Sequence, residues 1–276
     1  LPVFARKPAP VQITWLGYNF TTGLEAIDYR LSDNWLTPLE GRERFSERLY
    51  NLPRCSLAYR PPEKTPEPVE PAFESNGHIT FGSFNSLSKV SSRTIFLWAR
   101  VLNETPGSKL VLKARQSRDL GSKERILRVL GEQRVSPDRV IFKRYASSTF
   151  EHLAHYHEID LALDTFPYNG TTTTCEALWM GVPVVTLTGN HTVSRWGLSL
   201  VAAVGLEELA AKSEDEYCKI IKGLVYSHRR LKVLKTGMRD RLLSSPLCDA
   251  KGFADAVEEA FATMWKRWCD KQRLGT

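Results

Sequence analysis

Four consecutive threonines, Thr171 to Thr174, stand between an Asn-Gly turn signal and an apolar segment with helical spacing. A helix N-terminus presents unpaired backbone N–H groups and a partial positive charge, and both favour a bound phosphate. Threonine hydroxyls beside these groups add donors, and Gly170 lets the backbone approach a ligand closely. The run therefore predicts a phosphate site. The alternative is a simple turn in which one threonine caps the helix, and one hydroxyl would satisfy that interpretation.

Two further side chains extend this site toward a nucleoside diphosphate. Glu176, one turn into the helix, can accept hydrogen bonds from a ribose diol, as an acidic residue does in dinucleotide-binding folds. Lys89 follows an expected strand, and a lysine in such a loop can neutralise a diphosphate leaving group. Lys113, at the end of another expected strand, has the same potential, although most surface lysines have no such role. The Walker-type phosphate loop is absent from the sequence.

Three histidines, His152, His155 and His157, share one short segment, and the first two would lie on one helical face. A metal site is one interpretation, but neither H-E-x-x-H nor a convergent carboxylate pair accompanies them. We expect instead one histidine beside a phosphate or a base. No D-x-D occurs, so nothing in the sequence supports a metal–diphosphate chelate or a separate cofactor. Asp164 is expected to orient the following loop by accepting hydrogen bonds from its N–H groups.

An alternation of strand-like and helix-like segments positions these residues. Strands are expected at 78–84, 109–115, 139–145, 159–166 and 183–189, and helices at 92–102, 123–133, 149–157 and 173–181. Repeated β-α units predict an α/β protein with a parallel, doubly wound sheet and helices on both faces. Ligands bind such sheets beyond the carboxyl ends of the strands. Three loops expected there carry unusual polar residues, namely 85–91, 114–119 and the loop after Asp164.

The flanking regions have a different character. Residues 11–23 predict a strand and then a loop, and 26–33 predict a second short strand. The segment 60–71 contains five prolines and should be an extended connector. Beyond Val193 the pattern is nearly all helical, with a break at Ser245-Pro246 before a final amphipathic helix near 253–268. The main boundary is expected at the connector.

Composition sets wider limits. The 276 residues are 42% hydrophobic and 25% charged, as in globular proteins, and no apolar run is long enough to span a bilayer. The net charge of +7 favours anionic partners, but no basic run or recognition-helix signature supports nucleic-acid binding. Five scattered cysteines without C-x-x-C spacing predict neither disulfides nor zinc, and favour a reducing cytoplasm. The opening at Leu1 without methionine suggests a fragment of a longer chain.

Several stretches together resemble one family. The likeness is to the catalytic region of the O-linked N-acetylglucosamine transferase/SPINDLY family of glycosyltransferases, and it runs from about Pro8 to Trp265. It is carried by "PAPVQITWLGYNFTTGLEAIDYRLSD", "ITFGSFNSLSKVS", "DLALDTFPYNGTTTTCEALWMGVPVVTLTG" and "SRWGLSLVAAVGLEELAA".

The resemblance implies an inverting, metal-independent enzyme of glycosyltransferase-B type. Such an enzyme would move N-acetylglucosamine from UDP-GlcNAc, a substrate rather than a cofactor, to Ser or Thr of a protein. Residues 1–72 would be the end of an N-terminal catalytic lobe plus the linker, 73–245 a Rossmann-like donor-binding lobe, and 246–276 a helix packing back on the N-terminal lobe. The implied contacts are Leu16 and Gly17 beside the donor sugar, Lys89 on the diphosphate with a catalytic role, His152 near the nucleoside, Thr171, Thr172 and Thr173 at the phosphates, and Glu176 on the ribose.

This sequence also departs from the animal members of the family. They have histidine where Thr171 stands, aspartate for Glu176 and tyrosine for Ser88. The differences resemble bacterial members and leave the base and sugar of the donor open, because fucose and glucose users are related. The N-terminal lobe is expected to be truncated, with the family's acceptor-side histidines and tetratricopeptide repeats upstream of Leu1. A catalytically incomplete fragment that only binds a nucleotide sugar is therefore the alternative function.

Overall fold

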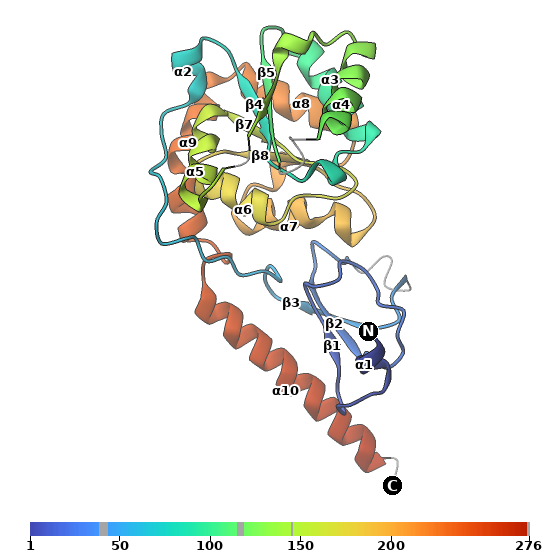
Figure 1. Cartoon of the computed structure of the whole chain (residues 1–276). Coiled ribbons are helices and arrows are strands. Elements are labelled where there is room, and N and C mark those ends of the chain that lie inside the picture. Colours follow the sequence, from blue (N-terminus) through green and yellow to red (C-terminus); the bar gives the residue numbers. More distant parts are fainter. Residues whose placement is uncertain (39–43, 115–118, 145, 275–276) are drawn as a thin grey trace.

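The structure, a computed structural model, describes residues 1–38, 44–114, 119–144 and 146–274. Most of the polar loop expected at 114–119 therefore lies outside the described residues. The described chain forms two parallel sheets, each with its own hydrophobic cluster (Figure 1). Among the described residues, no helix has the length and apolar character that crossing a membrane requires.

The larger sheet has six parallel strands in the order β6-β5-β4-β7-β8-β9. Counted from β4, this is the order 3-2-1-4-5-6 of dinucleotide-binding folds. The doubly wound sheet expected from the sequence is thus confirmed. Its strands are β4 (Thr80–Ser83), β5 (Lys109–Lys113), β6 (Val140–Lys143), β7 (Leu161–Leu163), β8 (Val184–Leu187) and β9 (Ala210–Ala211).

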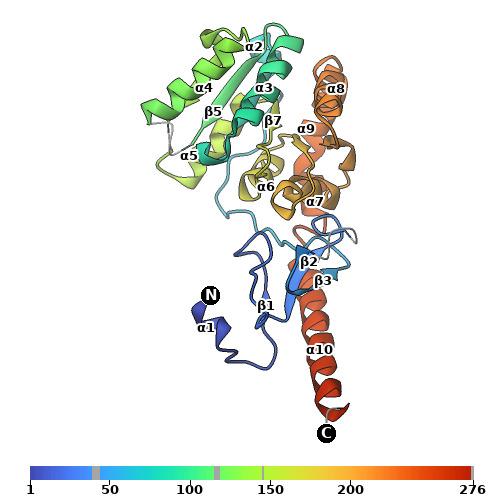
Figure 2. The ribbon, with the colours of Figure 1, turned by 90° about the vertical axis from the view of Figure 1, so that its right-hand side faces the viewer.

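Helices cover both faces of this sheet (Figures 1 and 2). Four of them begin at a Ser or Asp whose side chain accepts a hydrogen bond from the backbone of the first turn, which fixes their start. The helices of this part are α2 (Ala72–Asn76), α3 (Ser92–Glu104), α4 (Leu120–Glu132), α5 (Thr149–Ala154), α6 (Thr172–Trp179), α7 (Trp196–Ala203), α8 (Glu214–Val225) and α9 (His228–Leu243). Short 3₁₀ turns include η2 (Leu87–Lys89) and η5 (His155–Glu158).

The smaller sheet contains β1 (Ile13–Thr14), β2 (Tyr29–Asp33) and β3 (Arg48–Leu52), all parallel, and follows a short helix α1 (Pro2–Ala5). The last helix, α10 (Ala250–Leu274), lies along it (Figures 1 and 2). Their shared apolar cluster is formed by Tyr29, Leu31, Leu52, Ala260 and Met264. The strand and loop expected at 11–23 match β1 and the loop after it, and the strand expected at 26–33 matches β2, whereas β3 was not predicted.

The proline-rich segment 60–71 contains neither helix nor strand and connects the two sheets, as expected. It is fixed to the larger part by Arg239 of α9. The guanidinium donates to the Pro66 carbonyl at 2.7 Å and to the Glu67 carboxylate at 2.9 Å. These contacts attach the middle of the connector to α9.

Candidate functional site

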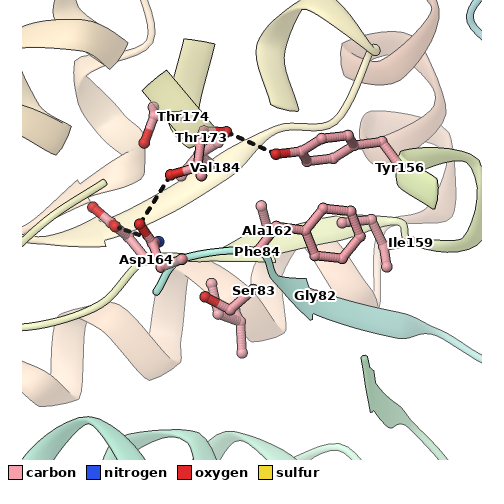
Figure 3. A pocket seen from close by; sticks show the side chains of 12 residues that line it. Gly82, Ser83, Phe84, Tyr156, Ile159, Ala162, Asp164, Thr173, Thr174 and Val184 are labelled. Atoms are coloured by element: carbon pink, nitrogen blue, oxygen red, sulfur yellow. Dashed lines mark hydrogen bonds between the residues drawn. The ribbon is translucent and has the colours of Figure 1, made fainter. Parts of the chain in front are cut away.

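The candidate site lies beyond the carboxyl ends of β4 and β7, adjacent strands between which the order of the sheet reverses. This is where open α/β sheets bind ligands. A small cavity of about 10 Å³ lies there, and Figure 3 shows residues that line it, with Tyr156 and Thr173 facing each other. The lining residues are Gly82, Ser83, Phe84, Asn85, Tyr156, Ile159, Ala162, Leu163, Asp164, Thr173, Thr174 and Val184.

Asp164 organises the loop between β7 and α6. Its Oδ1 accepts hydrogen bonds from the backbone N–H of Thr165 at 2.8 Å and of Gly170 at 2.7 Å. Its Oδ2 accepts one from the Thr186 hydroxyl at 2.8 Å. Burial raises the pKa of Asp164 to about 6, against the opposite effect of these hydrogen bonds. The expected loop-orienting role of Asp164 is confirmed.

Gly170 stands where a side chain would not fit. A Cβ atom at this position would lie 2.7 Å from Oγ1 of Thr173 and 2.9 Å from Oδ1 of Asn85. The glycine therefore permits a close approach, as the sequence analysis expected, but the groups that approach here are side chains of the protein. Oδ1 of Asn85 in turn accepts a hydrogen bond from the Thr173 hydroxyl at 2.9 Å. This bond connects the loop after β4 to the start of α6.

The threonine run begins α6 without capping it. Thr171 holds the N-cap position, yet its side chain makes no capping hydrogen bond. In the described part of the chain, neither Thr171 nor Thr172 uses its hydroxyl in a hydrogen bond, and Thr172 is exposed. The first-turn N–H groups of a helix have no intrahelical partners. Two hydroxyls and these N–H groups are thus available to a ligand, and capping does not explain the run.

Lys89 ends η2 and reaches the same loop from the β4 side. Its Nζ donates to the carbonyl of Asn169 at 3.0 Å and lies 4.4 Å from the centre of the Tyr168 ring. Burial lowers the pKa of Lys89, and the charge of Asp164 opposes this shift. The structure therefore brings Lys89 next to the segment that leads into the threonines.

His152 contacts Glu176 of α6. The imidazole Nε2 lies 2.9 Å from Glu176 Oε2, and Nδ1 contacts the ammonium of Lys113. An ammonium can only donate, so Nδ1 accepts, and Nε2 carries the hydrogen that is donated to Glu176. Lys113 is only 2% exposed, and this burial lowers its pKa while the charge of Glu176 opposes the shift. Lys113, His152 and Glu176 thus form one polar cluster. The role of Lys113 was left open by the sequence.

The other two histidines have separate partners. His155 Nδ1 lies 2.9 Å from Glu158 Oε1, and His157 Nε2 lies 2.8 Å from the carbonyl of Glu67. Across the described ranges, no group of three or more His, Cys, Asp or Glu side chains is placed to hold a metal ion. The histidine segment thus contributes His152 alone to the site.

Leu16 and Gly17 lie on the exposed loop after β1 of the smaller sheet, whereas the other predicted residues belong to loops and helices of the larger sheet. Leu16 has a φ of 47°, and the Gly17 N–H donates to the carbonyl of Trp15. The loop reaches the larger sheet through Asn19, whose Nδ2 donates to the Tyr168 hydroxyl.

The sequence analysis missed four residues of this region. Asn85 and Tyr168 fall within loops that it marked as polar, so their types were visible although their contacts were not. Tyr156, whose hydroxyl lies 3.3 Å from Glu176 Oε2, looked like one more apolar helix residue. No signal distinguished Asn19.

Comparisons with known proteins agree on one family. The sequence profile described as glycosyl transferase family 41 matches residues 2–58 and 74–257. A tomato (Solanum lycopersicum) protein named probable UDP-N-acetylglucosamine–peptide N-acetylglucosaminyltransferase SPINDLY is 41% identical over 98% of this chain. This chain spans only 29% of the length of that relative.

Solved structures give the same result. The structure of a Thermobaculum terrenum O-GlcNAc transferase mutant matches with a TM-score of 0.91 and 38% identity, covering 98% of this chain and 51% of that one. Sucrose-phosphate synthase from Thermosynechococcus elongatus shares the fold alone, with a TM-score of 0.58 and 16% identity over 88% of this chain and 60% of that one. The fold is of glycosyltransferase-B type. The chain belongs to glycosyl transferase family 41, as the resemblance of its motifs predicted.

Proposed function

We propose that this chain supplies the donor site of a glycosyltransferase that moves N-acetylglucosamine from UDP-GlcNAc to a Ser or Thr hydroxyl of proteins. The observation that carries the proposal is the start of α6. Hydroxyls of Thr171 and Thr172 stand unused beside free N–H groups. Lys89 contacts the loop just before this helix, and the His152–Glu176 pair lies one turn further along it. The donor and acceptor class follow the names of the relatives.

In the proposed complex the diphosphate lies against the first turn of α6. The N–H groups of the turn, the hydroxyls of Thr171 and Thr172, and the ammonium of Lys89 all donate to anionic oxygens. Thr173 contributes its N–H, because its hydroxyl is bonded to Asn85.

In the proposed complex the nucleoside and the sugar lie at opposite ends of the site. The ribose diol donates to Glu176, and the base lies near His152. The sugar points toward the loop of Leu16 and Gly17. Each of these contacts matches one chemical part of a nucleotide sugar.

The reaction we propose is a direct displacement with inversion. The acceptor hydroxyl attacks the anomeric carbon opposite the diphosphate and gives up its proton to that leaving group, and the bond from the carbon to the β-phosphate oxygen breaks with its electron pair. The negative charge that develops on the leaving diphosphate is stabilised by Lys89 and the N-terminus of α6. These fixed positive groups take the role that a divalent cation has in other sugar transferases, so the proposed reaction needs no metal.

Binding and transfer are tested separately. For binding, UDP-GlcNAc, UDP-glucose and GDP-fucose are titrated into this chain, and the proposal predicts tightest binding of UDP-GlcNAc. Tighter binding of UDP-glucose or GDP-fucose would mean that the transferred sugar is glucose or fucose instead. Because the chain spans 29% of its relative's length, we propose that alone it binds donor without transfer. Transfer is measured in a full-length protein that carries this region.

The remaining partners complete the proposal. The full-length protein is proposed to recruit acceptor proteins through upstream tetratricopeptide repeats and to work in the cytoplasm, where the five free cysteines of this chain stay reduced. Nucleic acid is not among the proposed partners. Retardation of DNA or RNA by this chain at low ionic strength, abolished by salt, would contradict that part.

A further inference from the structure

Tyr168 occupies the space between the two sheets of the molecule, directly beside Lys89. The face of its ring lies 4.4 Å from the Lys89 ammonium, at the distance of a cation–π interaction. Its hydroxyl accepts a hydrogen bond from the side-chain amide of Asn19, which belongs to the smaller sheet's first loop. One side chain thus contacts both the lysine and the opposite lobe.

Asn19 is held firmly enough to orient Tyr168. Its Oδ1 accepts the indole N–H of Trp196 at 3.2 Å, and Trp196 is only 2% exposed. With Oδ1 engaged there, Nδ2 must face Tyr168. Buried Arg30 donates to the carbonyls on both sides of Asn19, those of Tyr18 at 2.7 Å and Phe20 at 2.8 Å. The loop therefore presents the amide in one fixed direction.

The backbone of Tyr168 is fixed as well. Its carbonyl accepts the Thr165 hydroxyl at 2.6 Å, and the side chain of Asn169 donates to the Thr165 carbonyl at 2.8 Å. Both ends of the contact with Asn19 are thus anchored. The ammonium of a lysine, by contrast, sits on a flexible four-carbon stem.

We propose that Tyr168 is a positioning residue that holds the Lys89 ammonium ready for the donor diphosphate, and that Asn19 holds Tyr168 from the opposite lobe. Ordering Lys89 before the ligand arrives lowers the entropy cost of binding. The smaller sheet is then coupled to diphosphate binding although Asn19 need not touch the diphosphate. This inference rests on the proposed function of Lys89.

A double-mutant cycle on UDP affinity tests the coupling. Tyr168→Leu, which removes the ring, is expected to weaken UDP binding roughly three- to ten-fold. The same change in a Lys89→Ala background is expected to have no further effect, because Tyr168 acts through Lys89. An equal loss in both backgrounds would mean a general structural role and would overturn the inference.

Two milder variants test the link to the smaller sheet. Tyr168→Phe keeps the ring and removes the hydroxyl, and Asn19→Ala removes the same hydrogen bond from its other end. Each is expected to weaken UDP binding by about two-fold, and the double variant by no more than either alone. Tyr226→Phe is the matched control, since it removes a tyrosine hydroxyl that donates to the Glu104 carbonyl on an exposed surface. Additive losses at positions 19 and 168 would contradict the link.

A measurement without nucleotide separates this inference from the proposed function. The ring current of Tyr168 should shift the NMR signal of the Lys89 side chain in ¹³C-labelled protein. Asn19→Ala is expected to move that signal toward its position in Tyr168→Leu, whereas Tyr226→Phe leaves it in place. An unmoved signal in Asn19→Ala overturns the inference whether or not UDP binds. Failure of the unmodified, folded chain to bind UDP or GDP contradicts the proposed function instead.

Discussion

The Nε2 atom of His152 lies 2.9 Å from Oε2 of Glu176, so one imidazole joins the helix after β6 to the helix after β7. The Tyr156 hydroxyl lies 3.3 Å from the same carboxylate oxygen. These contacts hold Glu176 one turn into α6, while Lys89 contacts the loop that leads into this helix. The two side chains are therefore expected to act on different parts of a nucleotide.

Glu176→Gln is predicted to weaken UDP binding by about ten-fold, because a charged acceptor of ribose hydroxyls is lost. The loss should be smaller for 2′-deoxy-UDP, which lacks one of those hydroxyls. Glu132→Gln, which removes only a surface ion pair with Arg128, is the control. Calorimetry with both nucleotides decides the matter, and equal losses for the two would show that Glu176 does not bind the ribose.

Gly170→Ala is predicted to destabilise the protein by about 1–3 kcal/mol and to weaken UDP binding, because its methyl group would meet Thr173 and Asn85 below 3.0 Å. Gly223→Ala, in an exposed turn of α8 with nothing within 4 Å of the new Cβ, should instead stabilise by roughly 0.5–1 kcal/mol. Urea unfolding measures both. Unchanged stability and affinity in Gly170→Ala would contradict the tight packing described at this loop.

Asp164 predicts a specific pH dependence of stability. Its pKa rises from 3.8 to about 6 in the folded protein, so the folded state holds the proton more tightly than the unfolded chain. The stabilisation of the folded state that results from this tighter proton binding is fully present below about pH 4 and is lost as the pH rises through about 6. It amounts to at most about 3 kcal/mol. The Asp164→Asn protein has no ionisable group at this position, so its unfolding free energy should not fall in this way.

The check is urea unfolding of both proteins between about pH 4 and pH 7. The unfolding free energy of Asp164→Asn minus that of the unmodified chain is expected to rise across this range by up to about 3 kcal/mol. Groups that titrate equally in the two proteins cancel in the difference. A flat or falling difference would mean that burial does not raise the pKa of Asp164 in the folded protein.

Removal of divalent cations is predicted to leave donor binding intact. Lys89 and the first turn of α6 supply the positive charge, so the affinity for UDP in EDTA should stay within about two-fold of that in Mg²⁺ or Mn²⁺. Calorimetric titrations under the three conditions measure this directly. A large gain in affinity with either cation would contradict the metal-independent mechanism.

Much of the larger sheet could be predicted because most of its buried strands are rich in apolar residues and several of its helices have apolar spacing and a polar cap. The short strand Ala210–Ala211 has two residues of low strand preference inside a helical pattern, so its sequence carried no strand signal. Arg48–Leu52 lacks a clean alternation of buried and exposed side chains. Such strands exist through pairing with their neighbours, which local sequence does not show.

The positions of the candidate site residues were predictable to the same extent. The fold places Lys89, Thr171 and Glu176 at one edge of the larger sheet, because the carboxyl ends of parallel strands gather loops there. The contact of Asn19 with Tyr168 joins residues 149 positions apart and depends on how the two lobes meet. The sequence left open whether Lys113 has a role, and its contact with His152 could be seen only in the fold.

The most direct test of the donor site is a calorimetric titration of UDP into this chain and into Lys89→Ala, with GDP as the second ligand and thermal unfolding to show that both proteins are folded. The account predicts selective binding of UDP by the unmodified chain and a loss of at least about ten-fold in the variant, as expected for a charge-assisted contact. Equal affinity of the two proteins for UDP, or no binding of either nucleotide by the folded unmodified chain, would contradict it.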